Sequence, residues 1–109
     1  MSLSPSAPPA PIELDAAEVS AGMARGDLIL VDVREPNETA AEAIPGTVLM
    51  PLSRFDPAAL PQGNVVLTCL GGKRSAMALA RCHAAGVPVT THLRGGLAAW
   101  KAAGLPTTR

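Results

Sequence analysis

Residues 69–75, with the sequence CLGGKRS, contain the residue types that make a reactive sulfur nucleophile. The segment follows the apolar run 65–68 and precedes an alanine-rich stretch, which places its cysteine at the end of a strand, just before a helix. Two glycines let the loop curl around the sulfur, so that backbone N–H groups of the loop and of the helix start point at it. These donors and the two cations lower the pKa of a thiol and favour the thiolate, which is the nucleophile. Cys69 is therefore the candidate catalytic residue.

Strands and helices are expected to alternate along the chain. Apolar runs predict strands at 12–14, 28–33, 48–50, 65–68 and 89–93. Helices are expected at 16–25, 35–43, 53–60, 75–85 and 97–103. Asp15 and Glu18 are spaced as a capping box for the first of these helices, and Gly26 would end it. The alternation predicts an α/β fold, in which helices cover both faces of a parallel sheet.

Three separate segments follow strands of this expected sheet. Asp32 and Arg34 come at the end of the second strand, the Cys69 loop follows the fourth, and Gly95-Gly96 follows the fifth. Ligands of open parallel sheets bind beyond the carboxyl ends of the strands. The three segments are therefore expected to meet at one rim of the sheet.

Four stretches of the chain, in this order, resemble the motifs of single-domain rhodaneses, a family of sulfurtransferases. They are LVDVREP at 30–36, IPGT at 44–47, the cysteine loop at 69–75, and LRGGLAAW followed by AGLP within 93–106. A lone cysteine loop would be weak evidence, but four ordered motifs across roughly residues 12 to 106 are specific. The resemblance implies a three-layer α/β/α fold with a central parallel sheet of about five strands. It also implies transfer of sulfane sulfur through a Cys69 persulfide, without a cofactor.

The resemblance assigns roles to the residues around the cysteine. The active-site loop that binds substrate would be Leu70, Gly71, Gly72, Lys73, Arg74 and Ser75, supported by Asp32, Arg34, Gly95 and Gly96. Arg74 is expected to tie the loop either to backbone carbonyls or to an acidic residue, for which Asp32 and Glu35 are the candidates. Ser75 is most simply the N-cap of the following helix, with a possible second role as a donor to a bound persulfide. Lys73 points either to solvent or to an anionic substrate.

Other residues of chemically active types have plainer expected roles. Cys82 lies in the middle of a helix and is expected in the core, the alternative being a resolving thiol that pairs with Cys69. Trp100 is also expected in the core. His83 and His92 have no motif around them and are expected to be structural or to face solvent. No cluster of His, Cys and Asp has metal-ligand spacing, so no metal is expected.

Composition narrows the classes of partner. The 109 residues have a formal net charge of zero, 48% hydrophobic residues and 2% aromatics, which argues against binding nucleic acid or an anionic membrane. One rhodanese-like domain at 12–109 is expected after a disordered leader at 1–11. With two cysteines and no export signal, the chain is expected to be cytoplasmic with free thiols. Its oligomeric state stays open.

Two rival functions are weighed against sulfur transfer. Phosphatases and arsenate reductases of related fold need five residues between cysteine and arginine, whereas this chain has four. A non-catalytic binding or regulatory module is the other rival, but such modules commonly lose the cysteine. The sulfur donor would be thiosulfate or a persulfide, free or protein-bound, and the acceptor cyanide or a thiol. Leu70 stands where thiosulfate-using members often have a polar residue, and Ala43 where a His often precedes the IPG turn.

Overall fold

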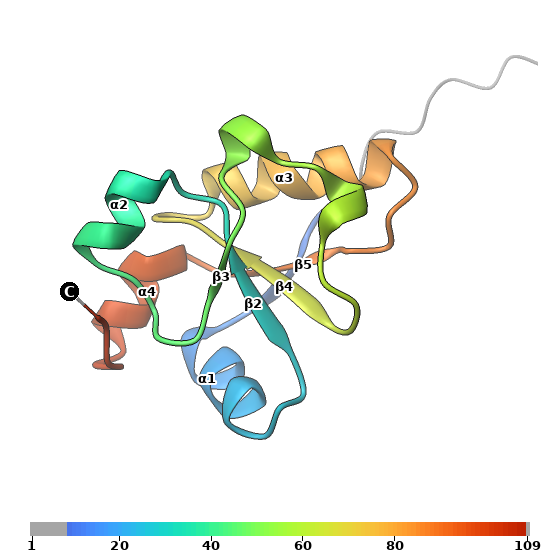
Figure 1. Ribbon diagram of the computed structural model, residues 1–109. Helices are drawn as coiled ribbons and strands as arrows, with labels where there is room; N and C mark the ends of the chain where they lie inside the picture. Colours follow the sequence, from blue (N-terminus) through green and yellow to red (C-terminus); the bar gives the residue numbers. More distant parts are fainter. Residues whose placement is uncertain (1–8, 109) are drawn as a thin grey trace, which may run out of the picture.

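The structure is a computed structural model that describes residues 9–108, and a five-stranded parallel sheet lies at its centre (Figure 1). The strand order is β1-β5-β4-β2-β3. The strands are β1 (Ile12–Leu14), β2 (Ile29–Asp32), β3 (Val48–Leu49), β4 (Val65–Thr68) and β5 (Thr91–Leu93). All four neighbouring pairs are parallel, so every strand ends at the same rim of the sheet.

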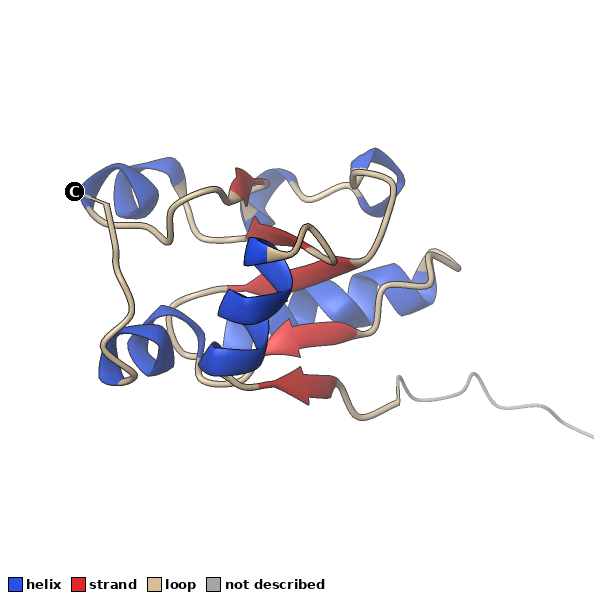
Figure 2. Ribbon diagram, turned by 90° about the horizontal axis from the view of Figure 1, so that it is seen from below, coloured by secondary structure: helices blue, strands red, loops and turns tan. Residues whose placement is uncertain are grey.

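Helices cover both faces of the sheet, as the alternating pattern predicts. They are α1 (Ala16–Ala24), α2 (Pro36–Ala41), α3 (Lys73–Ala84) and α4 (Gly96–Ala102), with one-turn 3₁₀ helices η1 (Leu52–Arg54) and η2 (Pro57–Ala59). In Figure 2, α1 crosses in front of the strands and α3 lies behind them. The expected three-layer α/β/α fold with a sheet of about five strands is confirmed.

The middle strand, β4, explains why an unbroken apolar run makes a strand here. Val65, Val66, Leu67 and Thr68 are all buried, because β4 lies between β2 and β5 and both of its faces are covered. Successive side chains enter opposite cores. Val65 and Leu67 pack with α3, whereas Val66 packs with α1 and α4. The strand that precedes Cys69 is thus hydrogen-bonded along both edges and packed against helices on both faces.

The first helix begins as its sequence predicts. The Asp15 carboxylate accepts a hydrogen bond from the Glu18 N–H at 2.8 Å, and the Glu18 carboxylate accepts one from the Asp15 N–H at 3.0 Å. This reciprocal capping box satisfies two donors that a helix N-terminus leaves without partners. It fixes the turn that joins β1 to α1.

Some element boundaries differ from the sequence prediction. The helix expected at 53–60 is wrong, because η1 and η2 replace it. Pro57 lacks an N–H and its ring would clash with a carbonyl one turn earlier, so the chain breaks and restarts with Asp56 capping the Ala58 N–H at 3.0 Å. The helix expected at 75–85 begins at Lys73 instead. β2 and β5 are shorter than the apolar runs that predict them.

The leader expected at 1–11 falls mostly outside the described residues, and the chain from Pro9 to Pro11 forms neither helix nor strand. Among residues 9–108, no helix has the length and apolar character needed to cross a membrane.

Candidate active site

Cys69 follows directly on the last residue of the middle strand, and its side chain points into the loop that leads to α3. The residue is 1% exposed. Its Sγ accepts a hydrogen bond from the Gly72 N–H at 3.0 Å and lies 3.6 Å from the Ser75 hydroxyl oxygen. The sequence predicts this cradle of donors, and the loop closes around the sulfur as expected.

Two opposed effects set the acidity of the Cys69 thiol. Burial raises its pKa, because the charged form loses solvation. Hydrogen bonds from the Ser75 hydroxyl and from the N–H groups of Ser75, Gly72 and Gly71 lower it, and together they outweigh burial. The net result is a pKa below the ordinary value, which favours the thiolate.

The turn Gly95-Gly96, which follows β5, brings the start of α4 against the backbone of the cysteine loop. Gly96 has φ +56°, and a Cβ there would collide with the Cys69 carbonyl oxygen and lie 2.8 Å from the Leu70 carbonyl carbon. Only glycine lets the two backbones come this close. The start of α4 then donates two hydrogen bonds to the loop, from the Leu97 N–H to the Cys69 carbonyl at 2.8 Å and from the Ala98 N–H to the Leu70 carbonyl at 3.0 Å. Gly95 and Gly96 thus lie where the sequence predicts.

Arg74 is held by an acidic residue other than the two expected. Its guanidinium makes a two-point ion pair with Glu38 of α2, at 2.7 Å and 2.8 Å, whereas Asp32 and Glu35 have other partners. Glu38 lies in the first turn of α2, facing the start of α3, a juxtaposition that sequence spacing did not reveal. The hydrogen bonds from Arg74 lower the pKa of Glu38 to about 2, against the opposing effect of burial.

Asp32 and Arg34 brace the rim beside the cysteine loop. Asp32 pairs with Thr68 across the sheet, one residue before Cys69. Its carboxylate accepts the Arg34 N–H at 2.9 Å and the Arg34 guanidinium at 2.8 Å, and the same guanidinium reaches the Glu42 carbonyl at 2.8 Å. Both side chains are buried, so this ion pair fixes the chain after β2.

Ser75 is not the N-cap of α3, contrary to the sequence prediction. The cap is Gly72, whose φ of +105° lets the helix start two residues earlier, so Ser75 is already in the first turn. Its hydroxyl lies 3.1 Å from the Gly72 carbonyl and 2.7 Å from Nδ1 of His92. His92 Nε2 in turn lies 3.0 Å from a carboxylate oxygen of Glu13.

Sequence reasoning missed His92 as a residue of the site. It is 3% exposed and lies in β5, next to Glu13 in the neighbouring β1. His83, for which the sequence gives the same expectation of a structural or solvent-facing residue, is exposed on α3. A charged or polar residue in the middle of each of two short strands was the available signal, but the pairing of β1 with β5 is needed to bring them together.

The remaining loop residues face outward. Leu70 is 49% exposed at the start of the loop, and Lys73 is exposed at the first turn of α3. Cys82 is fully buried in the core, where burial raises the pKa of its thiol. Both cysteines are free thiols, and only Cys69 has a lowered pKa.

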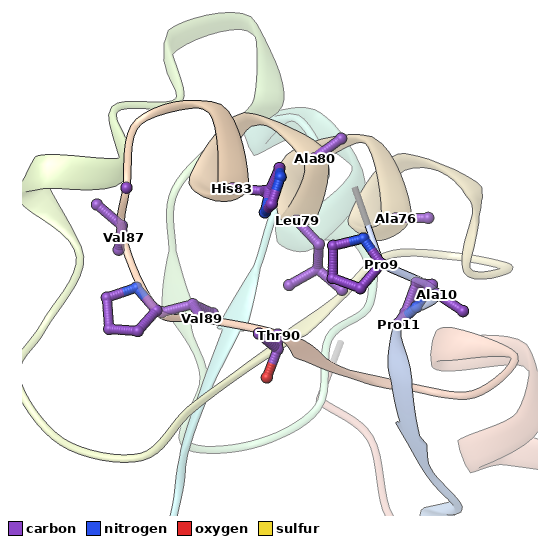
Figure 3. Close-up of a pocket in the computed structure, with 12 residues that line it drawn as sticks. Pro9, Ala10, Pro11, Ala76, Leu79, Ala80, His83, Val87, Val89 and Thr90 are labelled. Atoms are coloured by element: carbon purple, nitrogen blue, oxygen red, sulfur yellow. The ribbon is translucent and has the colours of Figure 1, made fainter. Parts of the chain in front are cut away.

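A pocket of about 390 Å³ lies elsewhere, between the Pro9–Pro11 segment, α3 and the turn before β5 (Figure 3). Its lining side chains include Leu79, His83, Val87 and Val89. None of its lining residues belongs to the cysteine loop at 69–75. The pocket is therefore separate from the rim of the sheet where Cys69 lies.

The α/β domain thus places a cysteine with a lowered pKa among backbone donors, just beyond the carboxyl end of its middle strand. The family model described as "Rhodanese-like domain" matches residues 15–103, and the chain belongs to that family.

Relatives of known sequence and structure agree with this assignment. A protein named "Sulfurtransferase" from Allochromatium vinosum is 35% identical over 98 residues, which cover 86% of this chain and 92% of that protein. An uncharacterized protein of Synechocystis is 49% identical over 85 residues, 75% of this chain, but the chain spans only 48% of it. The structure titled thiosulfate sulfurtransferase from Pseudomonas aeruginosa has 27% identity and a TM-score of 0.77, with 91% of this chain and 20% of that chain covered.

Proposed function

We propose that the protein is a sulfurtransferase that moves sulfane sulfur through a persulfide on Cys69. The observation that carries the proposal is the cradle around Sγ, above all the Gly72 N–H at 3.0 Å, together with the lowered pKa of the thiol. Such a site favours a sulfur anion, which is both the attacking nucleophile and the charged form of the product.

The reaction has two half-reactions. The Cys69 thiolate attacks the outer sulfur of the donor, the new S–S bond forms, and the donor's own bond to that sulfur breaks, which releases sulfite from thiosulfate or a thiolate from a persulfide. An acceptor nucleophile, cyanide or a thiol, then attacks the outer sulfur and the Cys69 thiolate leaves. The loop N–H groups stabilise negative charge on sulfur in both steps, and the alternation predicts ping-pong kinetics.

The surroundings of the sulfur bear on the donor. Sγ is nearly covered, so a donor has to present its sulfur end-on. Leu70 is half-exposed beside the loop and Lys73 is exposed at its end, an apolar and a cationic side chain. This pair suits an organic or protein-bound persulfide at least as well as the small dianion thiosulfate. We propose a cytoplasmic setting, because the reaction needs a reduced thiol and no cofactor.

Mass spectrometry tests the proposal directly. Incubation with thiosulfate or glutathione persulfide should add one sulfur atom, roughly 32 Da, at the reactive thiolate of the peptide that contains Cys69. Cys69→Ser should abolish the addition, and Cys82→Ser should retain it. If no donor loads Cys69 in the folded protein, sulfur transfer is wrong and a binding module becomes the better interpretation. If Cys82 is loaded instead, the site is wrong.

A further inference from the structure

A continuous chain of polar contacts joins the buried sulfur to the protein surface. Cys69 Sγ lies 3.6 Å from Ser75 Oγ, Ser75 Oγ lies 2.7 Å from His92 Nδ1, and His92 Nε2 lies 3.0 Å from Glu13 Oε2. Cys69, Ser75 and His92 are buried, whereas the Glu13 side chain is 43% exposed. The four side chains come from the loop after β4 and from α3, β5 and β1.

The hydrogen-bonding capacity of each group orders the protons along this chain. An ionised carboxylate only accepts, so the Glu13 contact requires the proton on Nε2 of His92. A neutral imidazole protonated there has a lone pair on Nδ1, which accepts the Ser75 hydroxyl proton. The Ser75 oxygen is then free to accept the Cys69 S–H.

We propose that His92 is the base that takes the thiol proton of Cys69, with the Ser75 hydroxyl as the carrier. The proton leaves Sγ for Ser75 Oγ as the hydroxyl proton moves from Oγ to His92 Nδ1. The products are a thiolate and an imidazolium, so total charge is unchanged and no electrons are exchanged. The Ser75 hydroxyl, whose hydrogen bond is reversed, now donates to the thiolate. His92 is thereby a positioning residue that acts on the sulfur through Ser75.

The charged side chains near His92 come from the elements packed around β5. Glu13 of β1 contacts the ring, and β4, its other neighbour in the sheet, has no charged residue. On α3 the Arg74 guanidinium pairs with Glu38 and the Arg81 guanidinium donates to the Leu52 carbonyl. The remaining charged or titratable side chains of α3 are Lys73 and His83, which are exposed to solvent, and Cys82, which is buried in the core. Arg94, the residue after β5, is also exposed. The Glu13 carboxylate is thus the charge in contact with the ring, where it can pair with the imidazolium that the relay forms.

The inference rests on the proposed function and deepens it, because it names the group that receives the proton when the buried thiol becomes the nucleophile. A serine carrier also explains why Ser75 stands inside the first turn of α3 and not at the cap. Within the first turn the hydroxyl lies between the sulfur and His92 Nδ1, and it is also 3.1 Å from the Gly72 carbonyl.

The test is a titration of the Cys69 thiol, by its alkylation rate with iodoacetamide and by the ultraviolet absorbance of the thiolate. Peptide mass mapping assigns the label to Cys69. His92→Asn keeps a group that can hydrogen-bond Ser75 but has no basic nitrogen. It should raise the apparent pKa of Cys69 and slow alkylation about tenfold at neutral pH, as for a rise of one in pKa. Glu13→Gln, which keeps an acceptor but removes the charge, should slow it about threefold.

Controls separate a proton relay from damage to the fold. His83→Asn changes the exposed histidine of the same protein and should leave the titration unmoved. Above the raised pKa, His92→Asn and Glu13→Gln should regain the parent alkylation rate, because the thiolate then forms by losing its proton to solvent. Structural damage would not be repaired by base.

Two results would overturn the relay. One is a Cys69 titration in both variants that matches the parent; the other is a slowed rate that stays slow at high pH. If His92→Asn fails to fold, Glu13→Gln decides alone, since Glu13 is partly exposed. The titration needs no sulfur donor, so its outcome is independent of whether Cys69 takes up sulfane sulfur.

Discussion

The two cysteines of this chain lie in one apolar core, but their thiols differ in acidity, because the pKa of each depends on its immediate hydrogen-bond donors. Cys69 and Cys82 belong to the same buried cluster beside α3. Burial raises the pKa of both thiols, but only Cys69 has hydrogen-bond donors that reverse the effect. The acidity of the thiol therefore depends on the hydrogen bonds of the loop and not on depth in the protein.

The exposed side chain next to the sulfur gives a prediction about donor choice. Leu70→Arg should raise kcat/KM for thiosulfate by about tenfold, as expected if one charge-assisted contact of about 1.4 kcal/mol is gained in the transition state. The measurement compares thiosulfate with glutathione persulfide at one ionic strength, because salt screens such contacts.

Leu70→Met is the matched control for this prediction, because it keeps an apolar side chain of similar size, and it should leave the ratio of the two donors unchanged. A wild-type preference for thiosulfate that Leu70→Arg does not alter would refute the role given to Leu70.

Among the residues of the site, the sequence identifies those that lie next to Cys69 along the chain. It misses those that contact the loop from other helices and strands. The cysteine, its glycines and its cations are contiguous, so their shared chemistry could be predicted. Ser75 was misassigned because the start of α3 depends on the left-handed backbone of Gly72. His92 and Glu38 were missed because each meets the loop only after separate elements pack.

At the scale of elements, the approach of α4 to the cysteine loop gives a second prediction. Gly96→Ala should displace the loop, because its Cβ would collide with the Cys69 carbonyl. The variant should lose the lowered pKa of Cys69 and most of the proposed activity. Its free energy of unfolding should fall by about 3 kcal/mol, the combined cost of a left-handed alanine and a steric clash.

Gly104→Ala is the matched control for the loop prediction. Gly104 has φ +75°, but a Cβ there meets nothing within 4 Å. It should cost only about 1 kcal/mol, the penalty for the backbone conformation alone. Urea unfolding and the Cys69 alkylation rate measure the two effects. Equal losses of stability in both variants, with Cys69 unaffected, would show that the close approach is not needed.

The ion pair between α2 and α3 gives a third prediction, which concerns pH. The folded-state pKa of Glu38 is lowered by Arg74 to about 2 from an ordinary value of 4.5. The pair therefore stabilises the protein at pH values above 4.5, and this contribution is lost as pH falls toward 2. Glu38→Gln should be less stable by about 1 kcal/mol at neutral pH, a modest effect because the pair is partly exposed.

Measuring the stability of wild type and Glu38→Gln at acid pH tests the direction of this pH dependence. The difference in free energy of unfolding between wild type and Glu38→Gln should shrink as pH falls from 4.5 through about 2, because below that pH Glu38 is protonated in both the folded and the unfolded protein. Arg25→Ala is a useful control, since Arg25 pairs with Asp27 on the surface with both side chains largely exposed. A difference that stays constant with pH would contradict the assigned role of the charge on Glu38.

Sequence patterns located all five strands, three of them from apolar runs, although β1 and β5 each have a polar or charged residue at their centre. The limits of the elements were less predictable, since apolar residues such as Leu28 and Val89 pack on the core without joining the ladder. The helix expected at 53–60 failed for a local reason, because a proline such as Pro57 disrupts the interior of a helix whatever the pattern around it.

At the scale of the whole molecule, the sheet separates two cores that must both be intact for the site to form. One core contains Cys82 beside α3, and the other contains Trp100 beside α1 and α4. The cysteine loop touches both, since it leads into α3 and is held by the start of α4. The family match over residues 15–103 spans both cores, and this agrees with a single unit of function.

This arrangement predicts that the two cores unfold together. Trp100 is the single tryptophan, buried with its Nε1–H donating to the Pro106 carbonyl at 2.8 Å, so its fluorescence reports the α1/α4 side. Cys82 is fully buried, so its alkylation reports the α3 side. In urea the two transitions should share one midpoint, as expected of a two-state domain of this size. If Cys82 becomes reactive at urea concentrations where Trp100 is still native, α3 opens on its own, and the cysteine loop at its N-terminus would be mobile in the folded protein.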